Sequence, residues 1–392
     1  MGNLVRVTHV VFDLDGGGME SLIGAIVRRL AGSSIVTSVV SLSGRSGRVG
    51  TSIAPFLDQY HVVRPVRGIS MIAPIGVARR IRQTRADVVH LHSGAWFKGA
   101  FAARLARTRR VIYTEHGREH DDPPLSRWLD RQAARWTDVV IPVSARLEAY
   151  LQTLGVPKER METIENGVDL TFFSPGRAPE GLRHRFNLPE GARIVGSIGR
   201  LERVKGYDRL LEVFAHLKRG EDPRHPCYLV ICGAGTQRES LVRQARDLGL
   251  EPYVRFPGWV DHPVEFYRLL DVFILTSRSE GLSLSLLEAL ACGVPAVVTA
   301  VGANEEVLGP TLRGQVISND DWAAFADVVK ATLASDDRRA EMGRLGRARV
   351  AARFNLDRLV ERYASLYTAG TALHPTSQPP QQPLMLGAES RT

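Results

Sequence analysis

Two glutamates near residue 280 have the spacing to bind a phosphorylated polyol. Glu280 and Glu288 bracket the segment 279–295, in which an apolar run at 272–275 leads through a loop into leucines at helical spacing. The helix that this pattern predicts offers free backbone N–H groups to an anion at its N-terminus. A carboxylate beside it would reach the hydroxyls of a ligand whose phosphates rest on those N–H groups. Two surface glutamates at the ends of a core helix would give the same pattern.

Two cations stand in a similar position earlier in the chain. Arg200 and Lys205 follow an apolar run at 193–199 that predicts a strand. They lie beyond the strand end where an anionic ligand would rest, and two cations suit a diphosphate. Arginine and lysine are common in loops, so these two residues alone do not define a site.

The first strand is predicted at 5–12, and three glycines, 16–18, separate it from helically spaced apolar residues at 22–30. Glycines at such a turn let the backbone approach a ligand closely. The segment 12–16, Phe-Asp-Leu-Asp-Gly, also resembles the first motif of haloacid-dehalogenase-type phosphatases. That alternative is disfavoured because Gly17 stands where the motif has Thr or Val, and because no later acidic pair follows a strand.

Histidines mark the ends of two further predicted strands. His90 and His92 lie on the strand at 88–92, and His116 follows the strand at 110–114. Ligands of parallel sheets bind at the carboxyl ends of the strands. Most lone histidines have structural roles, but His116 stands at a strand-to-loop junction beside Gly117 and is our candidate for a functional one.

These residues require two α/β domains to position them. Strands and helices alternate through the first half, and the period restarts near residue 193, which predicts two parallel, doubly wound sheets facing a cleft. At 392 residues with 44% hydrophobic content, the chain has enough core for two domains. The predicted divisions are an N-terminal domain at 1–172, a C-terminal domain at 173–350, a closing helix at 351–368, and a disordered tail at 369–392.

Composition and charge narrow the function classes. The three cysteines, Cys227, Cys232 and Cys292, have neither disulfide nor zinc-type spacing and predict buried thiols in a reducing compartment. No apolar run reaches membrane-spanning length, so we expect a cytoplasmic protein. The net charge of +9 is concentrated in the first half, with arginine clusters at 79–85 and 104–110. Such a face suits an anionic membrane surface or a phosphorylated acceptor, and no nucleic-acid-binding motif accompanies it.

The motifs together resemble the family 4 retaining glycosyltransferases of the GT-B fold, which have two Rossmann-like domains. The order of motifs is that of the family: Gly199-Arg200-Leu201 with Lys205-Gly206, Cys232-Gly233-Ala234-Gly235, Phe256-Pro257-Gly258, Glu280-Gly281-Leu282, Leu287-Glu288-Ala289 and Cys292-Gly293-Val294-Pro295. Gly17, Gly18, His116 and the segment 166–169 match its N-terminal and interdomain landmarks. The resemblance covers most of residues 1–368. It implies that the N-terminal domain, 1–172, binds the acceptor, that the C-terminal domain, 173–350, binds the nucleotide-sugar, and that the helix at 351–368 packs back on the first domain.

The resemblance implies a role for each site residue. Arg200 and Lys205 would hold the nucleotide diphosphate, and Glu280 would contact hydroxyls of the donor sugar. Glu288 would accept hydrogen bonds from the ribose hydroxyls. Backbone groups complete the implied donor site: Gly17 and Gly18 close over the donor, Gly233 lines it, and Leu284 and Ser285 present N–H groups to the phosphates. His116 would lie near the transferred sugar.

The implied reaction is retaining transfer of a hexosyl unit from a UDP- or GDP-linked sugar to a glycan or lipid-linked acceptor. We expect it to serve cell-envelope or exopolysaccharide biosynthesis, without a metal or other cofactor and without nucleic acid, in a cytoplasmic protein peripheral to the inner face of the plasma membrane. A nucleotide-sugar epimerase of similar fold and a non-catalytic sugar-nucleotide-binding protein are the alternatives. Gly302-Ala303 and Ser283 depart from residues that the family often has, Gly-Gly and Pro.

Overall fold

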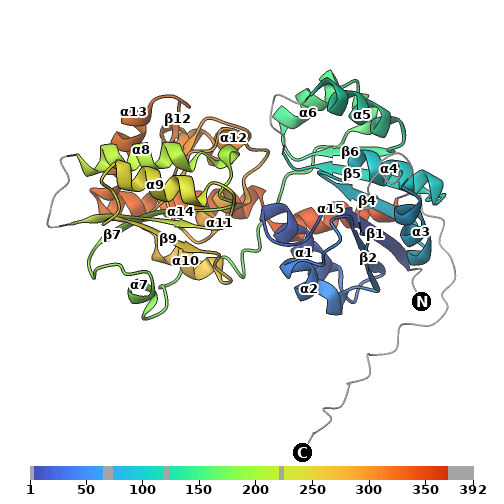
Figure 1. Ribbon diagram of the computed structural model, residues 1–392, viewed down its shortest axis with the longest axis horizontal. Helices are drawn as coiled ribbons and strands as arrows, with labels where there is room; N and C mark the ends of the chain where they lie inside the picture. Colours follow the sequence, from blue (N-terminus) through green and yellow to red (C-terminus); the bar gives the residue numbers. More distant parts are fainter. Residues whose placement is uncertain (1–3, 65–73, 118–122, 220–224, 370–392) are drawn as a thin grey trace, which may run out of the picture.

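The computed structural model describes residues 4–64, 74–117, 123–219, 225–369. Two α/β domains lie side by side in it (Figure 1). The predicted tail, 369–392, lies outside the described residues apart from Ala369. The predicted division after residue 172 stays a prediction, and the two sheets lie wholly on either side of it.

The first domain is built on a six-stranded parallel sheet of order β3-β2-β1-β4-β5-β6. Its strands are β1 (Val5–Val11), β2 (Ile35–Ser41), β3 (Gln59–Val62), β4 (Val88–His92), β5 (Arg110–Glu115) and β6 (Val139–Pro142). The central strands β1 and β4 are buried along nearly their whole length because helices cover both faces of the sheet. The two sides of the sheet carry separate apolar clusters, one under α3, α4, α5 and α6 and the other under α1, α2 and α15.

The helices of this domain alternate with its strands. They are α1 (Gly18–Leu30), α2 (Arg48–Ile53), α3 (Ile75–Thr84), α4 (Trp96–Leu105), α5 (Pro124–Arg135) and α6 (Ala145–Thr153), with single turns η1 (Ala54–Phe56) and η3 (Lys158–Arg160). In α1, buried residues recur at helical spacing from Leu22 to Leu30 on the side that faces the sheet.

The second domain repeats the strand order in its own six-stranded sheet, β9-β8-β7-β10-β11-β12 when read from the opposite edge. Its strands are β7 (Arg193–Ile198), β8 (Cys227–Cys232), β9 (Val254–Gly258), β10 (Val272–Leu275), β11 (Ala296–Thr299) and β12 (Val316–Ile317). Its helices are α7 (Leu182–Arg185), α8 (Tyr207–Lys218), α9 (Arg238–Asp247), α10 (Pro263–Leu269), α11 (Leu284–Ala291), α12 (Asn304–Leu308), α13 (Trp322–Leu333) and α14 (Asp336–Arg353), with turns η4 (Arg203–Lys205) and η5 (Pro310–Gln315). The strand order changes direction between β7 and β10, as it does between β1 and β4, and such switch points are where α/β sheets bind ligands.

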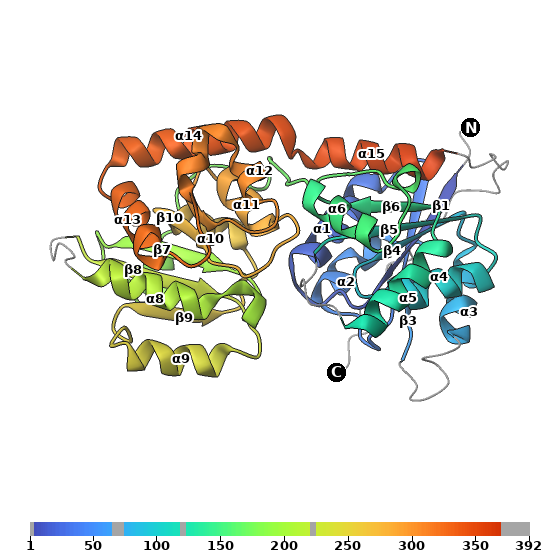
Figure 2. The ribbon, with the colours of Figure 1, turned by 90° about the horizontal axis from the view of Figure 1, so that it is seen from above.

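Helix α15 (Leu356–Thr368) ties the two domains together. Figure 2 shows α14 along the second domain and α15, next in the chain, along the first. Tyr363 and Tyr367 of α15 are fully buried against the first sheet. The interdomain segment is bonded to the start of this crossing, because Val168 donates to the carbonyl of Phe354 and accepts from the N–H of Leu356.

The predicted fold class, two Rossmann-like domains, is confirmed. The three cysteines are free and buried, as predicted. The ends of β1, β5 and β7 differ from the predicted ends by one residue, because the hydrogen-bond ladder stops there and periodicity carries no signal for the exact terminus. Apolar residues at helical spacing also predict a helix at 72–83, which falls partly outside the described residues and corresponds to α3.

Candidate active site

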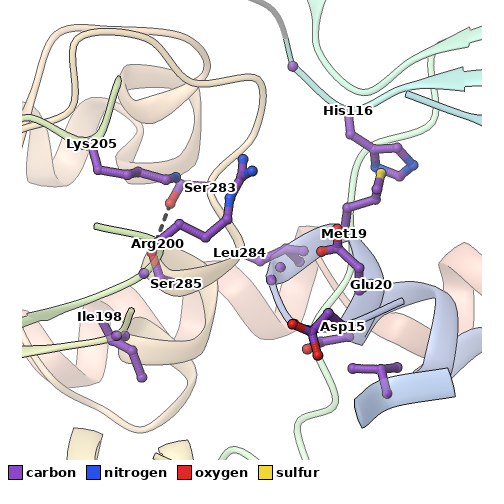
Figure 3. A pocket seen from close by; sticks show the side chains of 18 of the residues that line it. Asp15, Met19, Glu20, His116, Ile198, Arg200, Lys205, Ser283, Leu284 and Ser285 are labelled. Atoms are coloured by element: carbon purple, nitrogen blue, oxygen red, sulfur yellow. Dashed lines mark hydrogen bonds between the residues drawn. The ribbon is translucent and has the colours of Figure 1, made fainter. Parts of the chain in front are cut away.

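A cleft of about 1100 Å³ lies between the carboxyl ends of the two sheets. All ten predicted site residues line it, and they are Gly17, Gly18, His116, Arg200, Lys205, Gly233, Glu280, Leu284, Ser285 and Glu288. Figure 3 shows Arg200, Lys205, Leu284 and Ser285 on one side, with Met19, Glu20 and His116 on the other. His90 and His92 are buried in the sheet and do not line the cleft. The structure therefore brings the predicted residues together from both domains, while the role of each one stays a prediction.

The two cations stand after β7. Arg200 stands two residues beyond the end of the strand, and Lys205 ends the turn η4. Gly206 then adopts a left-handed conformation with φ of 64°, and a Cβ there would lie 2.1 Å from the carbonyl oxygen of Thr276. Glycine at this position is therefore what lets the turn pack against the end of β10. As a result Lys205 points toward the loop that carries Glu280.

Lys205 Nζ donates a hydrogen bond of 2.7 Å to Glu280 Oε1. The same oxygen accepts from the hydroxyl of Ser277 at 2.6 Å. The Glu280 side chain is only 7% exposed, so the pair is shielded from water and is held more firmly than a surface ion pair. Such a pair fixes both groups at the wall of the cleft.

Two glycines pack so closely against the backbone near Glu280 that neither position has room for a side chain. Gly302 has φ of 57°, and a Cβ on it would lie 2.3 Å from the carbonyl oxygen of Glu280. A Cβ on Gly281 would lie 2.0 Å from the carbonyl oxygen of His116, which belongs to the other domain. The loop that carries Glu280 therefore touches the backbone of both domains.

Helix α11 begins beside this loop. Its Ser283 is the N-cap residue, and the hydroxyls of Ser283 and Ser285 lie 3.1 Å apart. The first N–H groups of such a helix have no partners within the helix and attract anions. A Cβ on Gly18 would lie 3.1 Å from the side chain of Leu284, so the first turns of α1 and α11 nearly touch across the cleft.

Glu288 lies deeper, one turn further along α11. Its Oε2 accepts a hydrogen bond of 2.7 Å from the hydroxyl of Tyr267. Burial raises the pKa of Glu288 to about 7, and the bond from Tyr267 offsets only part of this effect. The carboxyl group is thus poised to change its ionisation near neutral pH.

On the first domain, His116 follows β5. Its backbone N–H donates to the hydroxyl of Ser93 at 2.8 Å, and its Nε2 lies 3.1 Å from Nδ1 of His92. Its Nδ1 is shielded and has no hydrogen-bond partner among the described residues. Burial lowers the pKa of His116 to about 4, although nearby Glu115 opposes the shift, so the ring is neutral at pH 7.

Two cleft residues had no assigned role in the sequence. Glu20, in the first turn of α1, faces the cleft, and burial raises its pKa despite the attraction of Arg200 across the cleft. A Cβ on Gly17 would lie 2.4 Å from its Oε2, so Gly17 leaves room for this carboxylate. Asn166 is buried and donates to the carbonyl of Leu282 at 3.0 Å, while its Oδ1 is without a partner in the described chain. Glu20 could have been found from its place two residues after the Gly17-Gly18 pair; Asn166 stood in the interdomain motif without a signal of its own.

Comparison with known proteins identifies the family to which the two domains belong. The family model described as glycosyl transferases group 1 matches residues 180–349, and the model described as Glycosyltransferase Family 4 matches residues 16–172. The two matches fall on the two domains, each with its share of the cleft residues.

A similar protein of Mycobacterium tuberculosis is the GDP-mannose-dependent alpha-(1-6)-phosphatidylinositol monomannoside mannosyltransferase, 31% identical over 89% of this chain and 94% of its own length. A D-inositol 3-phosphate glycosyltransferase of Corynebacterium urealyticum is 30% identical over 72% of both chains. Among solved structures, Anabaena HepE in complex with UDP and glucose has a TM-score of 0.78 at 20% identity, with 93% of this chain and all of that one covered. Sucrose-phosphate synthase of Thermosynechococcus elongatus has a TM-score of 0.77 at 20% identity, with 93% and 98% covered.

The fold and the cleft are those of a GT-B enzyme that uses a nucleotide-sugar. The chain belongs to glycosyltransferase family 4, and it is a glycosyltransferase. This membership rules against the phosphatase alternative for residues 12–16, and it places transfer ahead of epimerisation and of binding alone.

Proposed function

We propose that the protein transfers a hexosyl unit from a UDP- or GDP-linked sugar to a glycan or lipid-linked acceptor, with retention and without a metal ion. The observation that carries the proposal is the convergence of Arg200, Lys205 and the start of α11 on one wall of the cleft. Two cations and a helix N-terminus supply the positive charge that a departing diphosphate needs. This use of the cleft also agrees with the activity of the mycobacterial relative, which is named as a GDP-mannose-dependent mannosyltransferase.

The proposed reaction breaks the bond between the anomeric carbon and the oxygen of the diphosphate, and forms a bond to the acceptor oxygen on the same face. The acceptor hydroxyl then stands beside the leaving oxygen, which takes its proton. Arg200 and Lys205 stabilise the charge on the leaving group, and Glu280 holds sugar hydroxyls. Glu288 accepts from the ribose hydroxyls.

The donor class is tested by calorimetric titration of UDP, GDP and ADP, each with magnesium and with a chelator. We expect one nucleotide to bind with the same affinity in both conditions and to lose most of it in Arg200→Ala. Arg203→Ala is the matched control, because Arg203 lies in the same loop, is exposed, and accepts hydrogen bonds from Arg278 and Gly206 at its backbone carbonyl, which the substitution keeps. Binding that requires magnesium, or equal loss in both variants, contradicts the proposal.

The acceptor is proposed to meet the enzyme at an anionic membrane surface. Helices α3, α4 and α5 pack side by side on one face of the first domain, and their only acidic residue, Asp130, is buried. Exposed arginines occupy this face, and they are Arg79, Arg80, Arg82, Arg127, Arg131 and Arg135. On α5, Leu125 is 67% and Trp128 is 53% exposed, three residues apart on one side of the helix. A basic helix with exposed tryptophan and leucine is suited to anionic lipid headgroups.

None of the described helices is long and apolar enough to cross a bilayer. From the basic face of α3, α4 and α5 we propose that the protein is a peripheral enzyme of envelope or exopolysaccharide assembly on the cytoplasmic face of the plasma membrane. Flotation with vesicles that contain phosphatidylglycerol should recover the protein at low salt, and Trp128→Ser should reduce recovery. Leu248→Ser, which alters an exposed leucine of the other domain, is the control. Equal recovery with neutral vesicles, or no effect of Trp128→Ser, would remove this surface from the proposal.

A further inference from the structure

Three neighbouring strands of the first domain place histidines in a row that ends at the cleft. His9 lies on β1 and His92 at the end of β4, while His116 follows β5. His9 Nδ1 is 3.0 Å from His92 Nε2, and His92 Nδ1 is 3.1 Å from His116 Nε2. The planes of adjoining rings differ by only 21° and 27°. The row therefore connects the buried sheet to the wall that His116 forms.

The three rings are neutral at physiological pH. Burial lowers the pKa of His9 and of His116 to about 4, and it lowers the pKa of His92 far below its ordinary value. A neutral imidazole has one N–H donor and one bare acceptor nitrogen. Both ring nitrogens of His92 are hydrogen-bonded within the row, Nε2 to His9 and Nδ1 to His116.

The two hydrogen bonds of the row couple the tautomers of the three rings. If His9 donates from Nδ1, His92 Nε2 must be bare, so the proton of His92 is on Nδ1 and points to a bare Nε2 of His116. Reversing one bond reverses the other. The three rings thus carry their protons either all on Nδ1 or all on Nε2, because any mixture sets two N–H groups or two bare nitrogens against each other.

At each end of the row, one ring nitrogen takes no part in the hydrogen bonds between the histidines. His9 Nε2 and His116 Nδ1 are buried without a hydrogen-bond partner among the described residues. The first is enclosed in the sheet, whereas the ring of the second lines the cleft. A ligand hydroxyl can either donate or accept, so it can satisfy His116 Nδ1 in either state of the row.

A buried metal ion is the competing use of such a cluster. Nitrogens of His9, His90 and His92 lie within 4.8 Å of one another. However, His90 is already bonded at both nitrogens, to the hydroxyl of Tyr367 at 2.6 Å and to that of Thr114 at 2.7 Å. A metal would have to displace these bonds and the His9–His92 bond, so the row of hydrogen bonds is the better account of the cluster.

We propose that His92, supported by His9, is a positioning residue that holds His116 in one orientation and couples the tautomer of His116 to its own, leaving His116 Nδ1 for a hydroxyl of the transferred sugar. This inference rests on the proposed function for the identity of the ligand. The coupling of the three tautomers does not depend on it.

The test is long-range ¹H–¹⁵N correlation spectroscopy of the full-length protein labelled with ¹⁵N-histidine. The eleven histidines are assigned by single substitutions. We expect His9, His92 and His116 to show the same tautomer, and we expect the resonances of His116 to shift or to average between tautomers in His92→Phe. His90→Phe is the matched control, because His90 is equally buried on the same strand and its ring centroid lies 4.3 Å from that of His92 without joining the row. It should leave the tautomer of His116 unchanged.

Kinetics supply the second readout. His92→Phe should lower kcat about 10-fold to 100-fold, because a small misplacement of a positioned group can cost about 100-fold in rate, with the donor KM changed much less. His90→Phe does not break the row and should leave kcat within about threefold, below that range. Mixed tautomers in the wild type, an unchanged His116 in His92→Phe, or one equivalent of bound metal in the purified protein would each overturn the inference. Absence of any sugar transfer with intact tautomer coupling would count instead against the proposed function.

Discussion

Lys205, in the loop after β7, and Glu280, in the loop after β10, form a shielded ion pair with 2.7 Å between Nζ and Oε1. The two residues were expected to serve different parts of the donor, the diphosphate and the sugar. In the structure each neutralises the other, so the charge of Lys205 becomes available to a diphosphate only as its bond to Glu280 is shared or broken.

The pair predicts opposite effects on binding and on transfer. Glu280→Ala should leave the binding of a nucleoside diphosphate unchanged or tighten it, because Lys205 loses its competitor, yet should lower kcat with the sugar donor about 100-fold or more. Lys205→Ala should weaken both. Calorimetry and initial rates on the same preparations check this. Glu305→Ala, an exposed carboxylate paired with Arg313, is the control, and parallel losses of binding in both site variants would count against the competition.

A second prediction follows from Glu288, whose pKa lies near 7. Ribose hydroxyls donate to a carboxylate better than to a carboxylic acid, so ligand binding favours the ionised form. Affinity for an intact nucleotide-sugar should therefore fall as the pH is lowered from 8 to 6, and binding should release a proton. In Glu288→Gln this dependence should be lost. The sugar-linked donor is the right probe because its diphosphate has no terminal phosphate proton to titrate in that range.

The same group makes a prediction about stability. Burial raises the pKa of Glu288 in the folded state to about 7, above the ordinary glutamate value of 4.5 that applies to the unfolded chain, so the folded protein holds the proton more tightly. Stability therefore falls as the pH rises from about 4.5 to 7. Glu288→Gln, which is neutral throughout, should raise Tm at pH 8 relative to the wild type and change it little at pH 5. Differential scanning calorimetry of the wild type and the variant at pH 5 and pH 8 measures these Tm values. A lower Tm of the variant at both pH values would contradict the prediction.

The sequence allowed the site to be located because every predicted residue stands within a short distance of a strand end. Apolar runs place Arg200 after β7 and Glu280 after β10, and parallel strands bring their carboxyl ends to one edge. Periodicity alone is enough for this step. It also predicted both sheets, since parallel strands buried on two faces leave continuous apolar runs.

Side-chain contacts between distant segments could not be predicted in this way. The bond from Tyr267 to Glu288 depends on the packing of α10 against α11, and the row from His9 to His116 depends on the register of β1, β4 and β5. Neither leaves a pattern along the chain. Since these contacts set the ionisation and tautomer of the site residues, the structure was needed for the chemistry even where the sequence identified the residues.

Helix α15 should contribute much of the stability of the first domain. Tyr363 is fully buried against the first sheet, so Tyr363→Ala leaves a large cavity and should cost about 3–5 kcal/mol. Arg362→Ala, next in the helix and exposed, should cost less than about 1 kcal/mol because surface ion pairs contribute little. Chemical denaturation of the two variants measures the difference. Equal costs would mean that α15 is not packed as described.

Gly302 provides a test of how closely the Glu280 loop must be packed. Alanine at φ of 57° is strained, and its Cβ would lie 2.3 Å from the carbonyl oxygen of Glu280, so the loop must move. Gly302→Ala should therefore lower kcat/KM about 10-fold or more, since small misplacements of a positioned group are costly. Gly191→Ala has the same left-handed strain, with φ of 75°, but no atom within 4 Å. It should lose about 1 kcal/mol of stability at unchanged activity. If both variants keep full activity, the close contact between Gly302 and Glu280 does not position the carboxylate.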